Sequence, residues 1–118
     1  MPDRSNLLAD IDTLDADRWA AYLADDAVLR FGNGDPVQGR DACRDALAGF
    51  WDTIEGVHHD LVEQWETDSA TIVEVRITYT LPGGREVTVP GVTVYRTDDD
   101  DLIDDYRVYV DLAPLYAA

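Results

Sequence analysis

The apolar positions in the first third of the chain recur with the spacing of a helix. A stripe at spacings of one, four and seven residues is formed by Leu7, Leu8, Ile11 and Leu14. Asp15 is a typical N-cap residue, so it is predicted to begin a second short helix that carries Trp19 and Tyr22. A third helix is expected after Gly39, with an apolar face formed by Cys43, Leu47, Phe50, Trp51 and Ile54.

The rest of the chain shows the alternation of strands. Residues 26–31 form a short predicted strand that ends in the turn at residues 32–36. Four long strands are predicted over residues 57–67, 71–81, 86–96 and 105–111. The third of these contains Pro90 and Gly91, which predict a bulge or a sharp bend because proline lacks the N–H of a central ladder.

Helices followed by four long antiparallel strands predict an α+β fold. A strongly bent sheet wrapped around helices leaves a hollow between them, and a bend at residues 90–91 would supply part of that curvature. The sequence shows no repeat, linker or shift in composition. Residues 1–118 are therefore expected to form a single domain.

The charge of the chain is extreme for its size. It has 25 acidic residues against nine basic ones, all of them arginine, and a formal net charge of −16. Such a field repels nucleic acid phosphates and anionic membranes, so neither is an expected partner. Two interpretations fit the charge: a halophilic host that accumulates salt, which we favour, and an acidic protein from a GC-rich genome.

Other features predict a cytoplasmic protein. The chain opens without a basic and apolar signal pattern, and it has no apolar run of about 18 residues. The single cysteine, Cys43, excludes an intramolecular disulfide. It lies on an apolar stripe, which favours a packing role over that of a nucleophile.

The last predicted strand carries the side chains best suited to chemistry. With a period of two, Arg107, Tyr109 and Asp111 share one face of the strand. A cation, a phenol and a titratable carboxylate in one row are what a small acid/base site needs. The alternative is a polar face in water, on which Asp111 pairs with Arg107 or caps the C-terminal turn before Pro114.

Several stretches resemble a known family in their order and spacing. They are residues 24–28 (ADDAV), 36–42 (PVQGRDA), 89–96 (VPGVTVYR) and 106–114 (YRVYVDLAP). Together they resemble the SnoaL-like branch of the NTF2-like superfamily. The resemblance implies a cystatin-like cone, in which three N-terminal helices pack on a strongly bent, mostly antiparallel sheet that encloses a pocket. It also implies a small apolar organic ligand, no cofactor, and a homodimer through the outer sheet face.

The superfamily contains polyketide cyclases, limonene-epoxide hydrolases, ketosteroid isomerases and non-catalytic binding modules, so function depends on the site. The two acids of the isomerases would fall near Phe31 and near Val92 or Thr93, where this chain has no acid. An Asp of the hydrolases and the acid/base Asp of the cyclases both match Asp111. The hydrolases also need an Arg-x-Asp arrangement on their third strand, where this chain has Glu74 and Arg76 in reversed order. The partner histidine that the cyclases carry on the preceding strand is missing.

One histidine and several aromatic residues complete the candidate site. By alternation His59 shares the more apolar face of its strand with Leu61 and Trp65, and His58 points to the other face. The predicted pocket aromatics are Trp19, Tyr22, Phe31, Phe50, Trp51 and Trp65. No metal site is predicted, because adjacent histidines on one strand cannot both bind one ion. The run Asp98–Asp101 lacks the alternation of a calcium loop and is expected to be a solvated turn.

These features favour a cofactor-independent acid/base enzyme of the isomerase, cyclase or hydrolase type, acting on a small apolar organic molecule. Asp111 is its predicted general acid/base. Arg107 or Tyr109 is predicted to position Asp111 or to bind an oxyanion, and His59 to assist. The alternative is a non-catalytic ligand-binding or dimerisation module.

Overall fold

The computed structural model describes residues 6–117, and its elements follow the predicted order with two additions. The helices are α1 (Leu7–Asp12), α2 (Ala16–Ala20), α3 (Arg40–Trp51) and α4 (Ala113–Tyr116). The strands are β1 (Leu23–Phe31), β2 (Val37–Gln38), β3 (Gly56–Glu66), β4 (Thr71–Thr80), β5 (Glu86–Thr97) and β6 (Ile103–Val110). The additions, β2 and α4, are too short to leave a periodic signal in the sequence.

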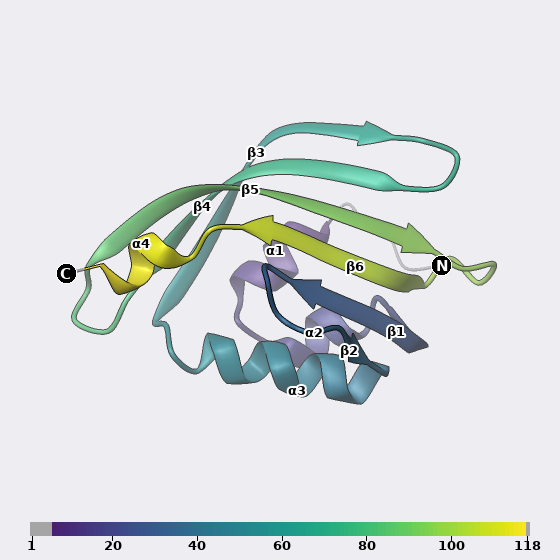
Figure 1. Cartoon of the computed structure of the whole chain (residues 1–118), viewed down its shortest axis with the longest axis horizontal. Helices are drawn as coiled ribbons and strands as arrows, with labels where there is room; N and C mark the ends of the chain where they lie inside the picture. Colours follow the sequence, from purple (N-terminus) through teal and green to yellow (C-terminus); the bar gives the residue numbers. More distant parts are fainter. Residues whose placement is uncertain (1–5, 118) are drawn as a thin grey trace.

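The strands belong to one mixed sheet with the order β2-β1-β6-β5-β4-β3. β1 runs parallel to β6, and the other neighbouring pairs are antiparallel. The sheet curves strongly, and α1, α2 and α3 lie on its concave side (Figure 1). The α+β cone with N-terminal helices on a bent, mostly antiparallel sheet is therefore confirmed.

Local interactions explain where α2 begins and ends. The Asp15 carboxylate accepts a hydrogen bond from the Asp17 backbone N–H at 3.0 Å, so Asp15 is the N-cap that the sequence predicts. α2 ends at Ala20, earlier than predicted, because Leu23 already pairs with Ile103 and opens β1. No helix among residues 6–117 is both long and apolar enough to cross a membrane.

The core lies between the concave face of the sheet and the helices. Alternation along β4 buries Val73, Val75, Ile77 and Tyr79. These side chains belong to one cluster with Ile11 of α1 and Leu47 of α3, so the first and third helices cover the same face of the sheet. Burial of this apolar area is the main stabilising term of such a fold.

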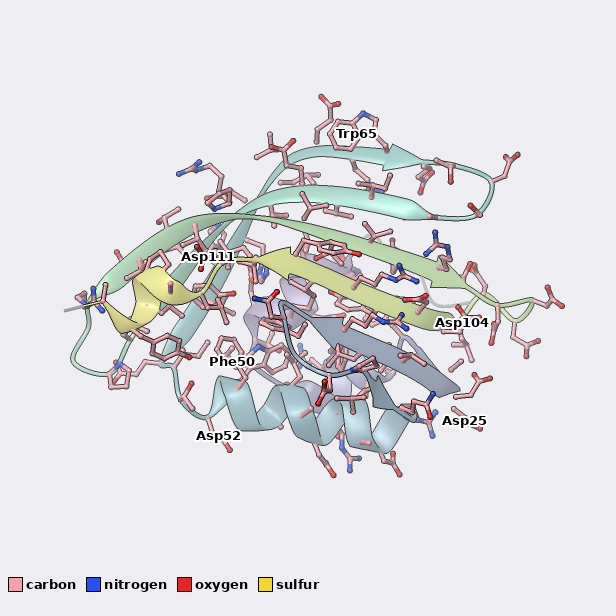
Figure 2. The ribbon with its side chains drawn as sticks, viewed as in Figure 1. Asp25, Phe50, Asp52, Trp65, Asp104 and Asp111 are labelled. Carbon is pink, nitrogen blue, oxygen red and sulfur yellow. The ribbon has the colours of Figure 1, made fainter. Side chains whose placement is uncertain are left out.

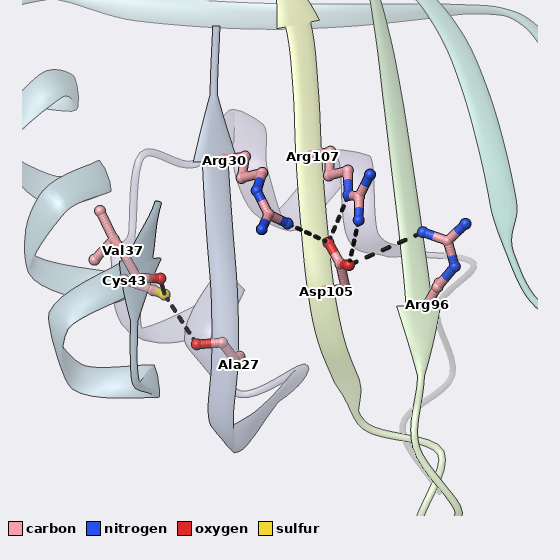
Figure 3. A network of polar contacts seen from close by, with 7 residues as sticks. All are labelled: Ala27, Arg30, Val37, Cys43, Arg96, Asp105 and Arg107. Atoms are coloured by element: carbon pink, nitrogen blue, oxygen red, sulfur yellow. Dashed lines mark hydrogen bonds and ion pairs between the residues drawn. The ribbon is translucent and has the colours of Figure 1, made fainter. Parts of the chain in front are cut away.

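Cys43 of α3 is a packing residue. Its side chain is fully buried, and its thiol donates to the carbonyl oxygens of Ala27 and Val37 at 3.6 and 3.3 Å (Figure 3). Burial raises the pKa of the thiol, which disfavours the thiolate that a nucleophile needs.

A single carboxylate joins three strands on the convex face of the sheet. Asp105 of β6 accepts hydrogen bonds from Arg107 Nε and Nη2 at 3.0 and 2.9 Å. It also forms ion pairs with Arg30 of β1 and Arg96 of β5, each at 3.9 Å (Figure 3). The Arg107 hydrogen bonds hold the pKa of Asp105 below its usual range, against the opposing effect of partial burial.

Pro90 and Gly91 do not shift the register of β5. β4 and β5 pair without interruption, with Arg76 opposite Pro90 and Val75 opposite Gly91, so the bulge considered at this point is absent. β6 ends at Val110, opposite Gly91, which leaves Pro90 with a strand neighbour on one side only. Proline is tolerated at such a position because it interrupts no second ladder.

Gly91→Ala is expected to destabilise the protein by about 1–3 kcal/mol, because its new Cβ would lie 2.8 Å from Ile77 Cδ1 in the packed core. Ile77→Val removes that methyl group, so the double variant should lose less than the sum of the single losses. Urea denaturation measures the free energies of unfolding.

Gly49→Ala is the matched control for this experiment. Nothing lies within 4 Å of a Cβ at Gly49, and alanine is favoured over glycine in a helix by about 1 kcal/mol. Strictly additive losses for Gly91→Ala and Ile77→Val would contradict the close contact between the two residues.

Candidate active site

A small cavity of about 40 Å³ lies inside the cone, between the concave face of the sheet and helices α1 and α3. Its apolar and aromatic lining includes Leu29, Phe31, Leu47, Phe50, Trp51 and Val108. Its polar lining is formed by His59, Tyr79, Thr93 and Tyr106. All five long strands contribute side chains to this lining, so the curvature of the sheet creates the site.

Aromatic rings pack against one another beside the cavity. The ring centroids of Phe31 and Phe50 are 5.4 Å apart, and Phe50 contacts Tyr79 edge to face at 5.9 Å. Figure 2 shows Phe50 between α3 and the sheet. The space that remains admits about three to four water-sized groups, whereas pockets for drug-sized ligands measure about 300–1,000 Å³.

The polar centre of the site is a contact between the end of α1 and a strand 47 residues further along the chain. Asp12 Oδ1 lies 2.6 Å from His59 Nδ1, and Asp12 Oδ2 accepts the backbone N–H of His59 at 3.1 Å. The side chains are 13 % exposed for His59 and 20 % for Asp12. Because the carboxylate engages Nδ1, a neutral His59 carries its proton there and keeps Nε2 as an acceptor.

Strand pairing sets the direction of the His59 side chain. His59 pairs with Ile77, and Val57 pairs with Tyr79, so these residues share the inward face of the sheet. Asp12 is the last residue of α1, where the helix dipole disfavours a negative charge. The two hydrogen bonds from His59 offset that penalty.

Asp12 also faces the neighbouring histidine. His58 Nδ1 lies 3.4 Å from Asp12 Oδ2, and His58 Nε2 lies 3.0 Å from Asp60 Oδ1. His58 is 64 % exposed, on the opposite side of the strand from His59. Asp12 therefore lies between an exposed and a partly buried imidazole, and His59 is the one that lines the cavity.

The two tyrosines of the lining are held in their neutral form. Burial raises the pKa of Tyr79 to about 12. Burial also raises the pKa of Tyr106, against the opposing effect of the nearby Trp19 and Thr93 side chains. Both phenols therefore remain protonated hydrogen-bond donors at ordinary pH, and His59 is the lining side chain that can take up a proton.

Arg107 and Tyr109 lie on the convex face of β6, and Asp111 follows the end of that strand, so none of the three lines the cavity that was predicted for them. Alternate residues of β6 line the cavity instead. Arg107 binds Asp105, and Tyr109 is 54 % exposed. Asp111 is exposed (Figure 2), and its Oδ1 accepts the backbone N–H of Ala113 at 2.9 Å, so it caps the C-terminal turn.

Half of the predicted pocket aromatics line the cavity: Phe31, Phe50 and Trp51. Trp19 is instead fully buried behind the lining, edge to face on Tyr106 with ring centroids 5.3 Å apart. Tyr22 is buried outside the lining, and its hydroxyl donates to Asp10 Oδ2 at 2.6 Å.

Trp65 does not reach the cavity because of a bulge in β3. The pairing with β4 skips one residue between Leu61 and Glu63. The extra residue reverses the alternation, so that Trp65 pairs with Ile72 on the convex face and is 44 % exposed (Figure 2). The period of two that places His59 in the cavity therefore ends at the bulge.

Asp12 is the site residue that sequence reasoning missed. Its partner lies 47 residues away, so no local spacing connects the two. One signal in the sequence was its position at the C-terminal end of a predicted helix. The helix dipole disfavours a negative charge there, so such an acid is expected to have a hydrogen-bond partner. Within residues 6–117, no group of three or more His, Cys, Asp or Glu side chains is arranged to hold a metal ion.

The cone-shaped α+β fold, with a small cavity and a carboxylate–histidine pair in its wall, is the fold of NTF2-like proteins. The chain belongs to the SnoaL-like domain family, whose model matches residues 6–106. No curated protein sequence matches the chain.

Solved structures share the fold at low sequence identity. A protein of Catenulispora acidiphila DSM 44928 with a ketosteroid isomerase-like fold, in complex with trimethylamine, has a TM-score of 0.83 at 19 % identity, over 95 % of this chain and 88 % of the other. A protein of Jannaschia sp. CCS1 described as a SnoaL-like polyketide cyclase has a TM-score of 0.75 at 17 % identity, over 98 % and 95 %. SalBIII, an epoxide hydrolase/cyclase-like enzyme of pyran ring formation in salinomycin, has a TM-score of 0.78 at 16 % identity, over 92 % and 88 %.

Asp12→Asn is expected to lower the free energy of unfolding by about 1–3 kcal/mol, because one amide oxygen cannot accept both hydrogen bonds from His59. Asp111→Ala removes only an exposed cap and should cost about 0.5–1 kcal/mol. Urea denaturation of both variants makes the comparison. A larger loss for Asp111→Ala than for Asp12→Asn would contradict the stabilising role assigned to the partly buried contact between Asp12 and His59.

Proposed function

We propose that the protein is a cofactor-independent acid/base enzyme that moves a proton on a compact organic molecule held in the cavity. His59 is the general acid/base, and Asp12 is its positioning residue. The observation that carries the proposal is the 2.6 Å contact between Asp12 Oδ1 and His59 Nδ1 at the wall of a small, mostly apolar cavity. Isomerisation, cyclisation and hydrolysis all use such a proton transfer.

The chemistry follows from the orientation of His59. Its Nε2 takes a proton from the bound molecule, and the electron pair of the broken bond stays on that molecule. The imidazolium that forms is stabilised by the negative charge of Asp12, which itself remains unprotonated. Nε2 then returns the proton, so the cycle needs no oxidant or reductant. Tyr79 and Tyr106 donate hydrogen bonds that orient a polar atom of the molecule.

The size of the cavity limits the substrate. A volume of about 40 Å³, roughly three to four water-sized spheres, is too small for a fused-ring polyketide unless Phe31 and Phe50 move. Support for a compact ligand comes from the Catenulispora acidiphila protein, which has the same fold and was crystallised with trimethylamine, a molecule of that size. The substrate proposed here is therefore much smaller than a steroid or a polyketide.

The alternative is a non-catalytic module that binds a compact molecule and returns it unchanged. The small size and aromatic lining of the cavity favour this alternative, because such a cavity can hold a ligand by packing alone. The Asp12–His59 contact favours the enzyme, because packing alone does not require a buried imidazole held by a carboxylate.

A homodimer through the convex face of the sheet is the second part of the proposal. Two cross-strand rows lie on this face: Trp65, Ile72, Val94 and Arg107, and next to them Glu63, Glu74, Val92 and Tyr109. The apolar side chains of these rows lie in the middle of the face. The arginines around Asp105 lie on one side, and the two glutamates lie on the other. A two-fold axis through the centre brings the arginine side of one copy onto the glutamate side of the next.

Val94→Arg is expected to weaken this dimer by at least about tenfold, because it places a charge in the apolar centre of the interface. Sedimentation velocity at micromolar concentration measures the effect. Tyr116→Arg, a substitution at a 73 % exposed position of α4, is the control that should leave association unchanged. A wild-type protein that sediments as a monomer would refute the dimer.

His59→Gln is expected to slow turnover by about 10²-fold or more, because it removes the group that carries the proton. The assay follows conversion or deuterium incorporation by proton NMR in D₂O, with compact carbonyl compounds, epoxides and alkylamines as probes. Asp12→Asn should slow the same probe, and Asp111→Asn should not.

Two outcomes of this assay would count against the proposal. Loss of turnover in Asp111→Asn with retention in His59→Gln would return the catalytic role to Asp111. Binding of the probes without any conversion by the wild-type protein would favour the non-catalytic module.

A further inference from the structure

We infer that the ligand of the cavity is a compact alkylammonium ion, held by the aromatic lining and by a hydrogen bond from its N–H to His59 Nε2. The inference rests on the proposed function, because it needs a neutral His59 whose Nε2 serves the cavity. The inference goes beyond the proposed function in two respects: it specifies that the ligand is positively charged, and it names His59 Nε2 as the atom that binds it.

The aromatic lining supplies the first part of the site. Phe31, Phe50, Trp51 and Tyr79 all line the cavity, and consecutive rings among them lie 5.4 and 5.9 Å apart. A cation within about 6 Å of an aromatic ring is attracted by the ring quadrupole, and more strongly when water is excluded. Several rings around so small a space bring any cation inside it within that distance.

The Asp12–His59 pair supplies the second part. Asp12 engages His59 Nδ1 at 2.6 Å, so the neutral ring offers its Nε2 as an acceptor for the N–H of an ammonium ion. The carboxylate of Asp12 lies behind the imidazole and is itself largely buried, with 20 % of its side chain exposed. A buried cation needs such a countercharge, because removing it from water is otherwise costly.

The remaining polar groups discriminate against an anion. No arginine, aspartate or glutamate belongs to the cavity lining that the structure describes, and the chain contains no lysine. Tyr79 and Tyr106 stay neutral in this lining. A carboxylate or phosphate ligand would therefore find no positive partner, and the net charge of −16 repels it further.

The volume sets the size of the ion. About 40 Å³ corresponds to roughly three to four water-sized spheres, which favours the smallest alkylammonium ions over long-chain or aromatic amines. Binding requires no bond to break: the ammonium N–H donates to Nε2, and its methyl groups contact the rings.

The test follows the His59 ring nitrogens by long-range ¹H–¹⁵N correlation while the full-length protein is titrated with four probes. Trimethylammonium combines the charge with an N–H, tetramethylammonium has the charge alone, and tert-butanol has a similar shape without charge. Tetraethylammonium is too large for the cavity. Excess KCl screens non-specific attraction of cations to the acidic surface.

Trimethylammonium is expected to bind at least about tenfold more tightly than tert-butanol and to shift the His59 Nε2 resonance. Tetramethylammonium should bind more weakly than trimethylammonium, and tetraethylammonium should leave His59 unchanged. His59→Leu, which keeps a side chain in the space but removes the acceptor, should abolish the preference for trimethylammonium. Phe50→Leu should weaken both small cations, and Asp111→Asn should change nothing.

Tert-butanol binding as tightly as trimethylammonium, with a shift at His59, would overturn the ammonium ligand while leaving the proposed acid/base cavity intact. If none of the probes shifts the His59 resonances, both the ammonium ligand and the proposed acid/base cavity would be refuted. An unchanged preference for trimethylammonium in His59→Leu would place the bound cation elsewhere on the molecule and would also refute the inference.

Discussion

The contact between Asp12 and His59 joins the first helix to the edge strand of the sheet, and the site depends on it. β3 has a strand neighbour on one side only, so α1 is what holds its inward side chains in place. One carboxylate oxygen binds the His59 ring and the other binds its backbone N–H. The contact therefore fixes the position of the strand and the orientation of the imidazole together. Leaving either partner unsatisfied in this partly buried setting would cost about 1–3 kcal/mol.

The second constraint is how little space the cone leaves. The strong curvature of the sheet directs side chains from five strands into the cavity, and several of these side chains are large aromatic rings. Phe31, Phe50 and Tyr79 pack against one another there, which stabilises the core and reduces the cavity to about 40 Å³. The sizes of the rings at a few inward positions therefore set the volume of the cavity.

Regular periodicity made most of the fold predictable. The alternation in residues 71–81 and the N-cap at Asp15 both correspond to elements that the structure contains. Trp65 was assigned to the wrong face because a bulge in β3 adds one residue, and nothing in the local sequence marks that insertion. Pro90 and Gly91 predicted a bulge or a sharp bend, and the uninterrupted register with β4 excludes the bulge. Proline is tolerated there because β6 ends opposite Gly91, which is a property of the whole sheet.

The candidate site was less predictable than the fold. Phe31, Phe50 and Trp51 line the cavity as predicted, because the periodicity of the sequence identifies the inward faces on which they lie. Asp12 and its link to His59 are a tertiary contact over 47 residues, which no spacing rule reports. Asp111 drew attention through its resemblance to catalytic acids, yet a carboxylate in that position can serve the backbone of the following turn equally well, as it does here.

The protonation of His59 in the unliganded wild-type protein tests the central claim most directly. Long-range ¹H–¹⁵N correlation at mildly alkaline pH distinguishes which ring nitrogen carries the proton. The account predicts a single Nδ1–H tautomer, held by Asp12 and exchanging slowly with water, with an unprotonated Nε2. A dominant Nε2–H tautomer would mean that Asp12 does not hold the ring, and that Nε2 cannot be the acceptor on which the proposed chemistry depends.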